Sequence, residues 1–428
     1  LKSLLINTTK SDEFVSPWFC LSMEDNINNH YLRAKKFSGK FKLKNENNNS
    51  FLNKKIRIGY YAADFHQHPG MVNMEGIFKN HNKDEFEIIG FYYGDLKKDK
   101  THLRIKKNFD KFFYVNNLED EEILKLSLEN KIDIAIYRAG LTINARSSIF
   151  SLKVAPIQVN FLGYPGTTAQ KGIDYIVSDR FVIPEKDEKF YSENIIFLTN
   201  CYYPRDNSRK ISDKKFFREK FKIPENSFVF CSFNSAYKIT KYEFKIWMEL
   251  LLQVKNSVLL LLASDSKMKL NLIKEAKKAN IESKRLIFLE KINLDDHLSR
   301  HSLADLFLDS FNCNAHTSAV DALWAGLPIL TKAGNSFASR ICGSIMNYFE
   351  MSELVVDSEE EYLNKAIDLA TDQKKYRDIK DRIIKAKKSG KYFDTKKYTL
   401  NLEKAFKKIH EMRINENKFE NIYIKDIQ

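Results

Sequence analysis

The sequence contains little of what interrupts or cross-links a chain. Among 428 residues there are only 8 prolines and 14 glycines, which argues against a disordered or fibrous protein. The five cysteines are scattered and show no C-x-x-C spacing: Cys20, Cys201, Cys231, Cys313 and Cys342. An odd, scattered set is typical of a reducing compartment rather than of a disulfide framework or a zinc site, so we expect a cytoplasmic protein.

Long apolar runs and targeting segments are also missing. The most apolar stretch, Val258–Ala263, is far too short to cross a bilayer, and it predicts a buried strand instead. No secretory signal pattern is present, and no membrane span is expected. The sequence starts at Leu1 rather than at methionine, so we expect it to be cut from a longer protein.

Signatures of metal and nucleic-acid binding are absent as well. No Asp-x-Asp pair occurs, so a divalent cation that chelates a diphosphate is not indicated. The net charge of +14 raises the question of nucleic acid, but the lysines are spread along the chain and interleaved with acidic residues. No basic run alternates with aromatic residues as a base-stacking surface would. The pattern favours solvated, lysine-rich faces, and no nucleic-acid partner is expected.

The sequence does contain two series of short apolar runs separated by helical stretches. The first series is 56–60, 86–91, 132–137, 157–161, 175–177 and 195–198, and the second is 228–233, 258–263, 285–289, 306–309, 328–331 and 354–357. Such alternation predicts parallel sheets that are covered by helices on both faces. We therefore expect an α/β fold of two Rossmann-like, doubly wound lobes with a cleft between them, and ligands at the carboxyl ends of the strands.

Polar stretches suggest how the chain is divided. The segment 204–226 interrupts the two series and marks the lobe boundary. We expect a helical or linker remnant at 1–50, an N-terminal lobe at 51–212, a C-terminal lobe at 213–394 and a C-terminal helix within 395–428 that packs back on the lobes. Within the remnant, Glu24–Ala34 predicts a helix and Lys44–Ser50 predicts a polar linker.

The most informative stretch is Cys313–Pro328, which follows a predicted strand and opens a predicted helix that stops at Gly326. A helix N-terminus offers unpaired amide donors and the positive end of the helix dipole, which suits a diphosphate. Thr317 and Ser318 add hydroxyl donors, and Asp321, about one turn on, is placed to accept from a ribose hydroxyl. The alternative is that the Thr–Ser pair serves only as an N-cap.

Three further loops follow predicted strands. One holds His66 and His68, where a neutral imidazole can accept a proton from a hydroxyl; the alternatives are a metal pair or a solvated histidine. A second holds Lys238, which can neutralise charge on a departing diphosphate, unless it is an ordinary surface lysine. The third is the glycine-rich turn Leu162–Thr167, where backbone amides can approach a sugar or phosphate closely.

Together these segments resemble the catalytic region of the O-linked N-acetylglucosamine transferase family, including its bacterial SPINDLY-like members. The resemblance runs from about residue 55 to 410 and rests on five segments in the same order. They are Ile58–Pro69, Ala155–Thr167, Phe233–Lys238, His316–Gly326 and Ala338–Arg340.

The resemblance implies a GT-B fold and an inverting, metal-independent glycosyltransferase. Such an enzyme moves N-acetylglucosamine from UDP-N-acetylglucosamine to Ser or Thr hydroxyls of a protein or peptide, without a cofactor. The N-terminal lobe would then be the acceptor side, and the C-terminal lobe would hold the nucleotide sugar. The resemblance implies nothing about the oligomeric state.

The resemblance also implies a role for each matching residue. His68, as a candidate base, and Lys238 would be catalytic. The donor diphosphate would be faced by His316, Thr317 and Ser318. The ribose and uracil would be surrounded by Asp321, His297 and Arg300. The sugar and acceptor pocket would be lined by Leu162, Gly163, Tyr164, Pro165 and Thr142. No residue is expected to bind a metal.

The sequence also departs from the family pattern. Ser235 replaces the glutamine that the animal enzymes carry, Leu294 stands in place of a second lysine, and Arg138–Thr142 lacks the Tyr or His that commonly precedes this Thr. The tetratricopeptide array that usually selects the substrate is not in this sequence, and residues 1–50 resemble the linker that follows such an array.

Other functions therefore stay open. They are GDP-fucose-dependent protein O-fucosylation, as in plant SPINDLY proteins, transfer to a glycan acceptor, and a binding or scaffold protein whose catalytic site has decayed. His316 with Asp321 and Trp324 resembles the UDP-sugar version of the family. The altered stretch Arg138–Leu141 gives the scaffold alternative its best support.

Overall fold

The computed structural model describes residues 16–44, 51, 53–263 and 265–426, and it divides into two compact units. Of the described residues, unit 1 contains 16–21, 26–207 and 394–426, and unit 2 contains 208–393 together with the short segment Ser22–Asp25. The division after Asn207 lies inside the polar stretch 204–226. Apart from Lys44, the predicted linker Lys44–Ser50 is outside the described residues, as are residues 1–15 of the predicted remnant.

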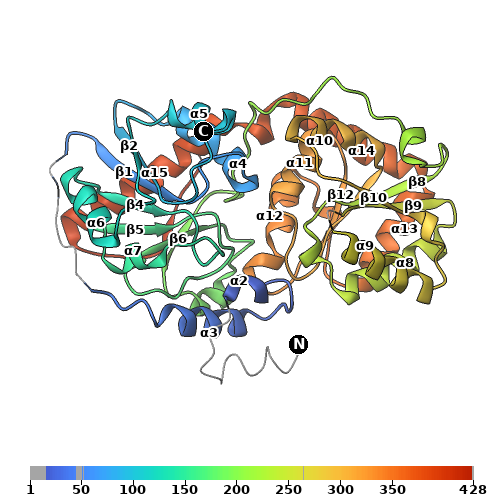
Figure 1. Ribbon diagram of the computed structural model, residues 1–428, viewed down its shortest axis with the longest axis horizontal. Coiled ribbons are helices and arrows are strands. Elements are labelled where there is room, and N and C mark those ends of the chain that lie inside the picture. Colours follow the sequence, from blue (N-terminus) through green and yellow to red (C-terminus); the bar gives the residue numbers. More distant parts are fainter. Residues whose placement is uncertain (1–15, 45–50, 52, 264, 427–428) are drawn as a thin grey trace. The chain divides into compact units, whose positions relative to one another are not determined.

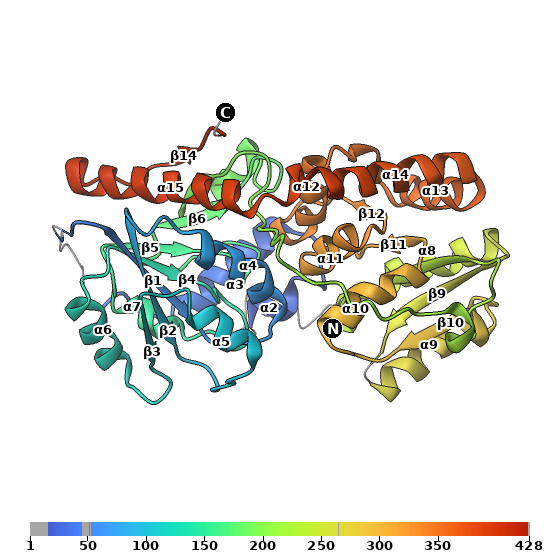
Figure 2. The same cartoon turned by 90° about the horizontal axis from the view of Figure 1, so that it is seen from above.

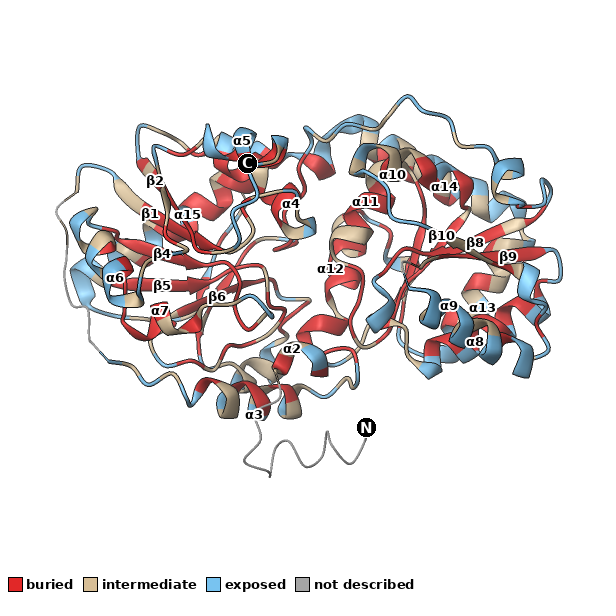
Figure 3. Cartoon of the chain, viewed as in Figure 1, coloured by how far each residue is buried: buried red, intermediate tan, exposed pale blue. Residues whose placement is uncertain are grey.

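Unit 1 is built on one parallel sheet with the strand order β3-β2-β1-β4-β5-β6-β7-β14. Every position of β4, β5 and β6 is buried, so helices must cover both faces of this sheet (Figure 3). The strands are β1 (Ile56–Ala62), β2 (Phe86–Tyr92), β3 (Lys111–Tyr114), β4 (Ile134–Tyr137), β5 (Ile157–Asn160), β6 (Tyr175–Ser178), β7 (Asn194–Phe197) and β14 (Ile422–Tyr423).

The helices of unit 1 make three sets of contacts: α4 contacts both α5 and α15, α6 contacts α7, and α2 contacts α3. The long C-terminal helix α15 runs along unit 1 (Figure 2). It begins where Asp394 caps the amide of Lys397, and it ends at Asn417, which has a left-handed backbone. The helices are α2 (Pro17–Cys20), α3 (Ile27–Ser38), α4 (Pro69–Asn80), α5 (Lys100–Lys106), α6 (Asp120–Glu129), α7 (Ser147–Ser151) and α15 (Thr395–Glu416).

Unit 2 is built on a second parallel sheet, of order β10-β9-β8-β11-β12-β13. The apolar run at 258–263 forms β9, as predicted. The strands are β8 (Phe228–Ser232), β9 (Ser257–Leu262), β10 (Leu286–Leu289), β11 (Leu306–Leu308), β12 (Ile329–Lys332) and β13 (Val355–Val356). The helices are α8 (Lys241–Gln253), α9 (Ser266–Lys278), α10 (Leu294–Arg300), α11 (Thr317–Ala325), α12 (Ile341–Tyr348), α13 (Glu359–Thr371) and α14 (Gln373–Ser389).

The prediction of two parallel α/β lobes is thus confirmed, with differences at the margins. The helix predicted at Glu24–Ala34 lies instead at Ile27–Ser38, because the side chain of Asn26 accepts from the amide of Asn29 and fixes a later start. The short strands β3 and β14 were not predicted. They lie at the two edges of the sheet, and β3 is nowhere fully buried, so neither has the apolar run of a central strand.

The two sheets share the same topology. Numbered along the chain, the first six strands of each unit have the spatial order 3-2-1-4-5-6. In unit 1, Figure 1 shows β2, β1, β4, β5 and β6 following one another across the sheet. The direction of winding reverses between the first and fourth strands, which are β1 and β4 in unit 1 and β8 and β11 in unit 2. In sheets of this kind, ligands bind beside the carboxyl ends of the strands at such a switch point. None of the described helices is long and apolar enough to span a membrane.

Candidate active site

The switch point of unit 1 brings together three polar side chains from the loops that follow β1 and β4. Oδ2 of Asp64 lies 2.6 Å from Nη1 of Arg138 and 2.9 Å from Nδ1 of His68. The Arg138 side chain is only 5% exposed, whereas that of His68 is 42% exposed. Burial alone would raise the pKa of Asp64, but the Arg138 charge and the His68 hydrogen bond outweigh it and lower the pKa. The carboxylate therefore stays ionised.

His68 owes its position to the helix that it precedes. It is the N-cap residue of α4 and is followed by Pro69 at the first helical position, which fixes the chain direction there. The neighbouring His66 is partly buried, and its ring centre lies 6.2 Å from that of His68. Nowhere in the described ranges do three or more His, Cys, Asp or Glu side chains gather in a way that would hold a metal ion.

The glycine-rich turn after β5 interlocks with the loop after β4. A Cβ on Gly163 would lie 2.4 Å from the carbonyl oxygen of Arg138, and a Cβ on Gly140 would lie 2.5 Å from Cβ of Tyr164. Leu162 has a φ of 138°, a region that bulky residues rarely adopt. Such strain persists only where the surroundings enforce it, and it gathers at functional sites.

Glu193 anchors this turn, and sequence reasoning missed it. Its buried carboxylate accepts from the amide of Thr168 at 2.7 Å, from the Thr168 hydroxyl at 2.6 Å and from the hydroxyl of Thr167. Asn160 adds a bond from Nδ2 to the carbonyl of Gly166 at 3.2 Å. Glu193 immediately precedes β7, far along the chain, and no local motif marks it as a partner of this turn.

The predicted pocket residues of unit 1 are thus on adjoining loops. Tyr164 and Pro165 are buried, whereas Thr142 is half-buried in the turn after β4, where its amide donates to the carbonyl of Ala139 at 3.3 Å. These loops all follow strands β1, β4 and β5, which are neighbours in the sheet.

The switch point of unit 2 holds a buried lysine. Lys238 ends a short 3-10 turn after β8, is only 8% exposed, and donates from Nζ to the carbonyl of Asn314 at 2.6 Å. Asn314 lies in the loop that joins β11 to helix α11, which begins at Thr317. An ordinary surface lysine would point into solvent, so that alternative for Lys238 is wrong.

Asp309 organises this switch point, although no sequence motif marks it. It lies just after β11 and is fully buried. Its Oδ1 accepts from Nδ2 of Asn234 at 3.0 Å and from the amide of Ala315 at 2.6 Å, and its Oδ2 accepts from the hydroxyl of Thr331 at 2.7 Å. Burial raises the pKa of Asp309, and these bonds offset part of that increase.

The start of α11 is not capped in the way that the alternative interpretation required. The N-cap residue is His316, so Thr317 and Ser318 are the first two helical residues and neither is the cap. Burial, followed by the positive charge of Lys238, lowers the pKa of His316 well below its usual value, so its imidazole is neutral. As predicted, the helix stops at Gly326, whose φ is 82°.

Asp321 lies on the buried side of α11 and has a partner that sequence reasoning missed. Its Oδ1 lies 2.5 Å from Nη2 of Arg209, with 8% of the Asp321 side chain and 4% of the Arg209 side chain exposed. Arg209 comes from the irregular segment at the start of unit 2, and only the tertiary structure brings it to α11. The carboxylate predicted to hold a ribose is therefore ion-paired in this structure.

The predicted nucleotide residues of α10 lie in the same neighbourhood. Nε of Arg300 donates to Nδ1 of His297 at 2.9 Å, and the ring of His297 packs edge-on against that of His301 with centres 4.7 Å apart. Burial lowers the pKa of His297 to about 2 and that of His301 to about 4. The charge of Asp321 partly opposes the shift of His301, and that of Arg209 adds to both.

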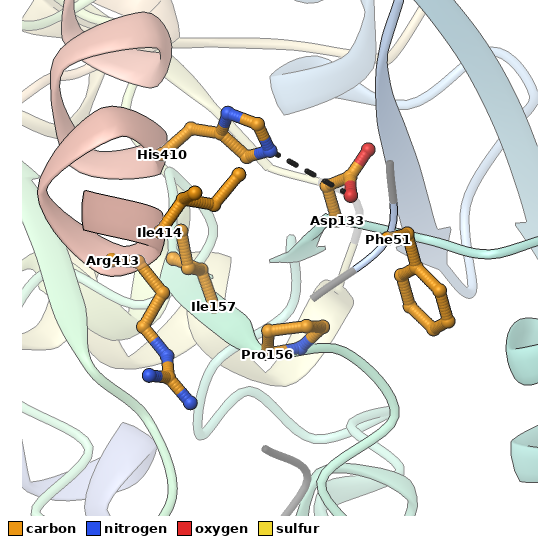
Figure 4. Close-up of a pocket in the computed structure, with 7 residues that line it drawn as sticks. All are labelled: Phe51, Asp133, Pro156, Ile157, His410, Arg413 and Ile414. Carbon is orange, nitrogen blue, oxygen red and sulfur yellow. Dashed lines mark ion pairs between the residues drawn. The ribbon is translucent and has the colours of Figure 1, made fainter. Parts of the chain in front are cut away.

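Unit 1 also contains a small cavity (Figure 4). Asp133 and Pro156 immediately precede β4 and β5, so the cavity adjoins the amino ends of the strands rather than the edge where ligands bind. Nε2 of His410 lies 3.7 Å from Oδ1 of Asp133 across it. Its lining is Phe51, Asp133, Pro156, Ile157, His410, Arg413 and Ile414.

Comparison with known proteins finds a family match that covers both lobes. The family model of glycosyl transferase family 41 matches residues 35–216 and 215–402. The chain is 33% identical to the probable UDP-N-acetylglucosamine–peptide N-acetylglucosaminyltransferase SEC of Arabidopsis thaliana. The matched region covers 83% of this chain and 37% of that protein. The chain is 27% identical to the similarly named SPINDLY of Hordeum vulgare, over 82% of the chain and 38% of that protein. The chain thus spans less than two fifths of these relatives.

A solved structure agrees at the level of the fold. A mutant of the O-GlcNAc transferase of Thermobaculum terrenum superposes with a TM-score of 0.83, covering 91% of this chain and 75% of that one at 22% sequence identity. The two parallel-sheet lobes therefore correspond to the GT-B arrangement of that structure.

Proposed function

The chain belongs to glycosyl transferase family 41, and from that premise we propose that it transfers N-acetylglucosamine from UDP-N-acetylglucosamine to Ser or Thr hydroxyls of a protein. The observation that carries the proposal is the buried Lys238 beside the start of α11, at the switch point of unit 2. The names of the plant relatives support the donor and the peptide acceptor.

Unit 2 is proposed to hold the donor. The diphosphate would lie at the start of α11, where amides together with the hydroxyls of Thr317 and Ser318 can donate to its oxygens. The ribose and uracil would lie near Asp321 and the α10 cluster of His297 and Arg300. A ribose hydroxyl that donates to Asp321 would share this carboxylate with Arg209.

Lys238 is proposed to stabilise the leaving group. In a direct displacement, the acceptor oxygen bonds to the anomeric carbon as the bond from that carbon to the diphosphate oxygen breaks. Configuration at that carbon inverts, and UDP leaves with the electron pair. A lysine held in a buried site can stabilise the negative charge that grows on the diphosphate. Together with the α11 amides it supplies positive charge from the protein, which supports transfer without a metal ion.

Unit 1 is proposed to receive the acceptor. His68 is its candidate base, because an exposed imidazole beside an ionised carboxylate can take up the hydroxyl proton. Leu162, Gly163, Tyr164, Pro165 and Thr142 are proposed to line the sugar and acceptor pocket. We propose a cytoplasmic location for the reaction, since all five cysteines are buried and none forms a disulfide.

A donor panel tests the proposal. Purified protein in EDTA is heated with UDP, GDP, UDP-N-acetylglucosamine and GDP-fucose, and saturating UDP at about a hundred times its dissociation constant is expected to add roughly 2.7 kcal/mol of stability. Mass spectrometry then scores transfer to a Ser/Thr peptide library and to glycans. Stabilisation by GDP alone, or only with magnesium, contradicts the donor or the metal-free proposal. Binding without transfer to any acceptor favours a decayed scaffold.

A further inference from the structure

The nitrogen Nδ1 of His68 has three polar neighbours. Oδ2 of Asp64 lies at 2.9 Å, the backbone nitrogen of Gly70 at 3.3 Å and Nη2 of Arg138 at 3.5 Å. The first neighbour can only accept a hydrogen bond while it is ionised, and the other two can only donate. The position of the imidazole proton decides which of these contacts are favourable.

The distances favour one tautomer. With its proton on Nδ1, His68 donates to the Asp64 carboxylate at the shortest of the three distances, within the normal range for a charge-assisted bond. With its proton on Nε2, a lone pair on Nδ1 would face that carboxylate at 2.9 Å, and only the two longer contacts would be satisfied. In water the opposite tautomer of histidine is the more populated one, so the site reverses the ordinary preference.

Arg138 holds the carboxylate in place. Its guanidinium is almost fully buried and lies 2.6 Å from the same oxygen, Oδ2 of Asp64, that faces His68. The second oxygen of Asp64 is buried and has no partner among the described residues, so the orientation of the carboxylate depends on Oδ2. The guanidinium also needs Gly70, because a Cβ at that residue would lie 2.1 Å from Nη2 of Arg138.

We propose that Arg138 and Asp64 are positioning residues that hold His68 with its proton on Nδ1, leaving Nε2 to accept the proton of the acceptor hydroxyl. This inference rests on the proposed transfer reaction. As the hydroxyl oxygen bonds to the anomeric carbon and UDP departs, the hydroxyl proton moves to Nε2. Asp64 stabilises the resulting imidazolium, which later returns the proton to solvent.

Imidazole nitrogen chemical shifts test the tautomer directly. The protein is labelled with ¹⁵N-histidine, and the His68 signals are identified among the nine histidines by their loss in His68→Gln. With the imidazole of His68 neutral, we expect Nδ1 to carry the proton and Nε2 to have the shift of an unprotonated nitrogen. A protonated Nε2 in the unmodified protein overturns the proposal.

Three variants should weaken this preference, each in a different way. Asp64→Asn removes the charge, Arg138→Met removes the guanidinium, and Gly70→Ala displaces the guanidinium while preserving the charges. Each is expected to raise the population of the Nε2–H tautomer. Gly70→Ala is the sharpest of the three, because Gly70 lies in the first turn of α4, where alanine favours the helix and no strained backbone is involved. Loss of folding is therefore not expected from it.

Arg146→Met is the matched control. Arg146 also belongs to unit 1 and pairs with an acid, Asp120 at 2.7 Å, but it precedes α7 and bonds to the carbonyls of Val115 and Leu118. Its removal should leave the His68 shifts unchanged. If Gly70→Ala and Arg138→Met leave them unchanged as well, Arg138 has no positioning role.

Kinetics then connect the tautomer to transfer. Asp64→Asn is expected to lower kcat by roughly 10²-fold, the low end of what a positioned base contributes, with little change in KM for the donor. The nitrogen shifts need neither donor nor acceptor, so they report even if no transfer is found. An inactive protein with the expected shifts contradicts the proposed function alone, whereas an active one with Nε2–H contradicts this inference alone.

Discussion

The switch points of the two units have the same topology but differ in chemistry. In unit 1, the loops after β1 and β4 place Asp64 and Arg138 beside His68, whose side chain is 42% exposed. In unit 2, the corresponding loops after β8 and β11 bury Lys238 against a backbone carbonyl and hold Asp309 in a network of neutral donors. One edge carries a group that can exchange a proton with solvent, and the other a cation shielded from it.

This difference shows how one topology can serve two tasks. A shielded cation interacts more strongly with a nearby anion than an exposed one, because little water screens the charges. A base must be reachable by its substrate and by solvent, and it needs a fixed proton position rather than burial. The comparison therefore supports the proposed function, in which unit 2 would stabilise charge and unit 1 would accept the proton.

The largest expected effect is at Lys238. Lys238→Ala should lower the turnover number by roughly 10²–10³-fold, about 2.7–4 kcal/mol, since a contact that strengthens in the transition state is lost. The exposed Lys241→Ala, in the same loop-to-helix region, should leave turnover unchanged. Steady-state rates of both variants measure the two effects, and circular dichroism confirms that both are folded. A fully active Lys238→Ala would remove the chemical distinction between the two switch points.

A smaller effect is expected for Asp321. Asp321→Asn should weaken UDP binding by about 1.5–3 kcal/mol, the usual range for a hydrogen bond to a charged group. The acid at the other switch point supplies the contrast, because Asp64→Asn should bind UDP as the unmodified protein does. Calorimetric titration of the three proteins measures both. Equal affinities throughout would show that Asp321 serves only to pair with Arg209.

Two glycines with positive φ separate backbone strain from loop packing. Gly140 has a φ of 55° and Gly326 a φ of 82°, so alanine is strained at both, by roughly 1–2 kcal/mol. At Gly326 the added Cβ would meet nothing closer than 3.7 Å, whereas at Gly140 it would lie 2.5 Å from Cβ of Tyr164. Denaturant unfolding should show the larger loss for Gly140→Ala, and only that variant should also reduce transfer. Equal losses of unfolding free energy would mean that the loops around Gly140 can move apart at little cost to accommodate the added Cβ.

The smallest expected effect for each side chain is the pH dependence of stability that buried histidines produce. Burial lowers the pKa values of His297, His301 and His316 in unit 2, so the folded unit keeps them neutral. Their stabilising contribution is complete above the unfolded value of about 6.5 and is lost as the pH falls below it, by up to about 1.4 kcal/mol per pH unit for each histidine. In unit 1, burial lowers the pKa of two histidines, His66 and His81.

Hydrogen exchange measures this difference unit by unit. After correction for the intrinsic pH dependence of exchange, peptides from the core of unit 2 should lose more protection between roughly pH 7 and 5.5 than those of unit 1. The raised pKa of Asp309 acts in the opposite direction, since it favours the folded state as the pH falls, so Asp309→Asn is measured in parallel. Greater loss in unit 1 would contradict the prediction.

The fold could be predicted largely from periodicity. Inner strands such as β1, β2 and β9 are mostly apolar because both faces of their sheets are covered, and that pattern is visible in the sequence. The edge strands β3 and β14 could not be predicted in this way, because an edge strand needs no long apolar run. The start of α3 was misplaced because the Asn26 cap was not recognised.

The candidate site was predictable to the extent that it lies directly after predicted strands. His68, Lys238 and the start of α11 could be found in this way, since the carboxyl end of a parallel strand is where ligand groups gather. Glu193, Asp309 and Arg209 could not be singled out. Each acts on a loop distant in sequence, and a lone acid or arginine outside a motif carries no signal of its partner.

By itself, the sequence determined the α/β class, the two series of strands and the family resemblance, because these depend on local periodicity and on short ordered motifs. Only the tertiary structure decided which charges meet. Arg138 had no assigned partner until the fold placed it 2.6 Å from Asp64, and Asp321 was a lone helical acid until the fold brought Arg209 to it. Ion pairs and buried hydrogen bonds depend on distances of a few ångströms, and those distances are fixed by the packing of segments far apart in the chain.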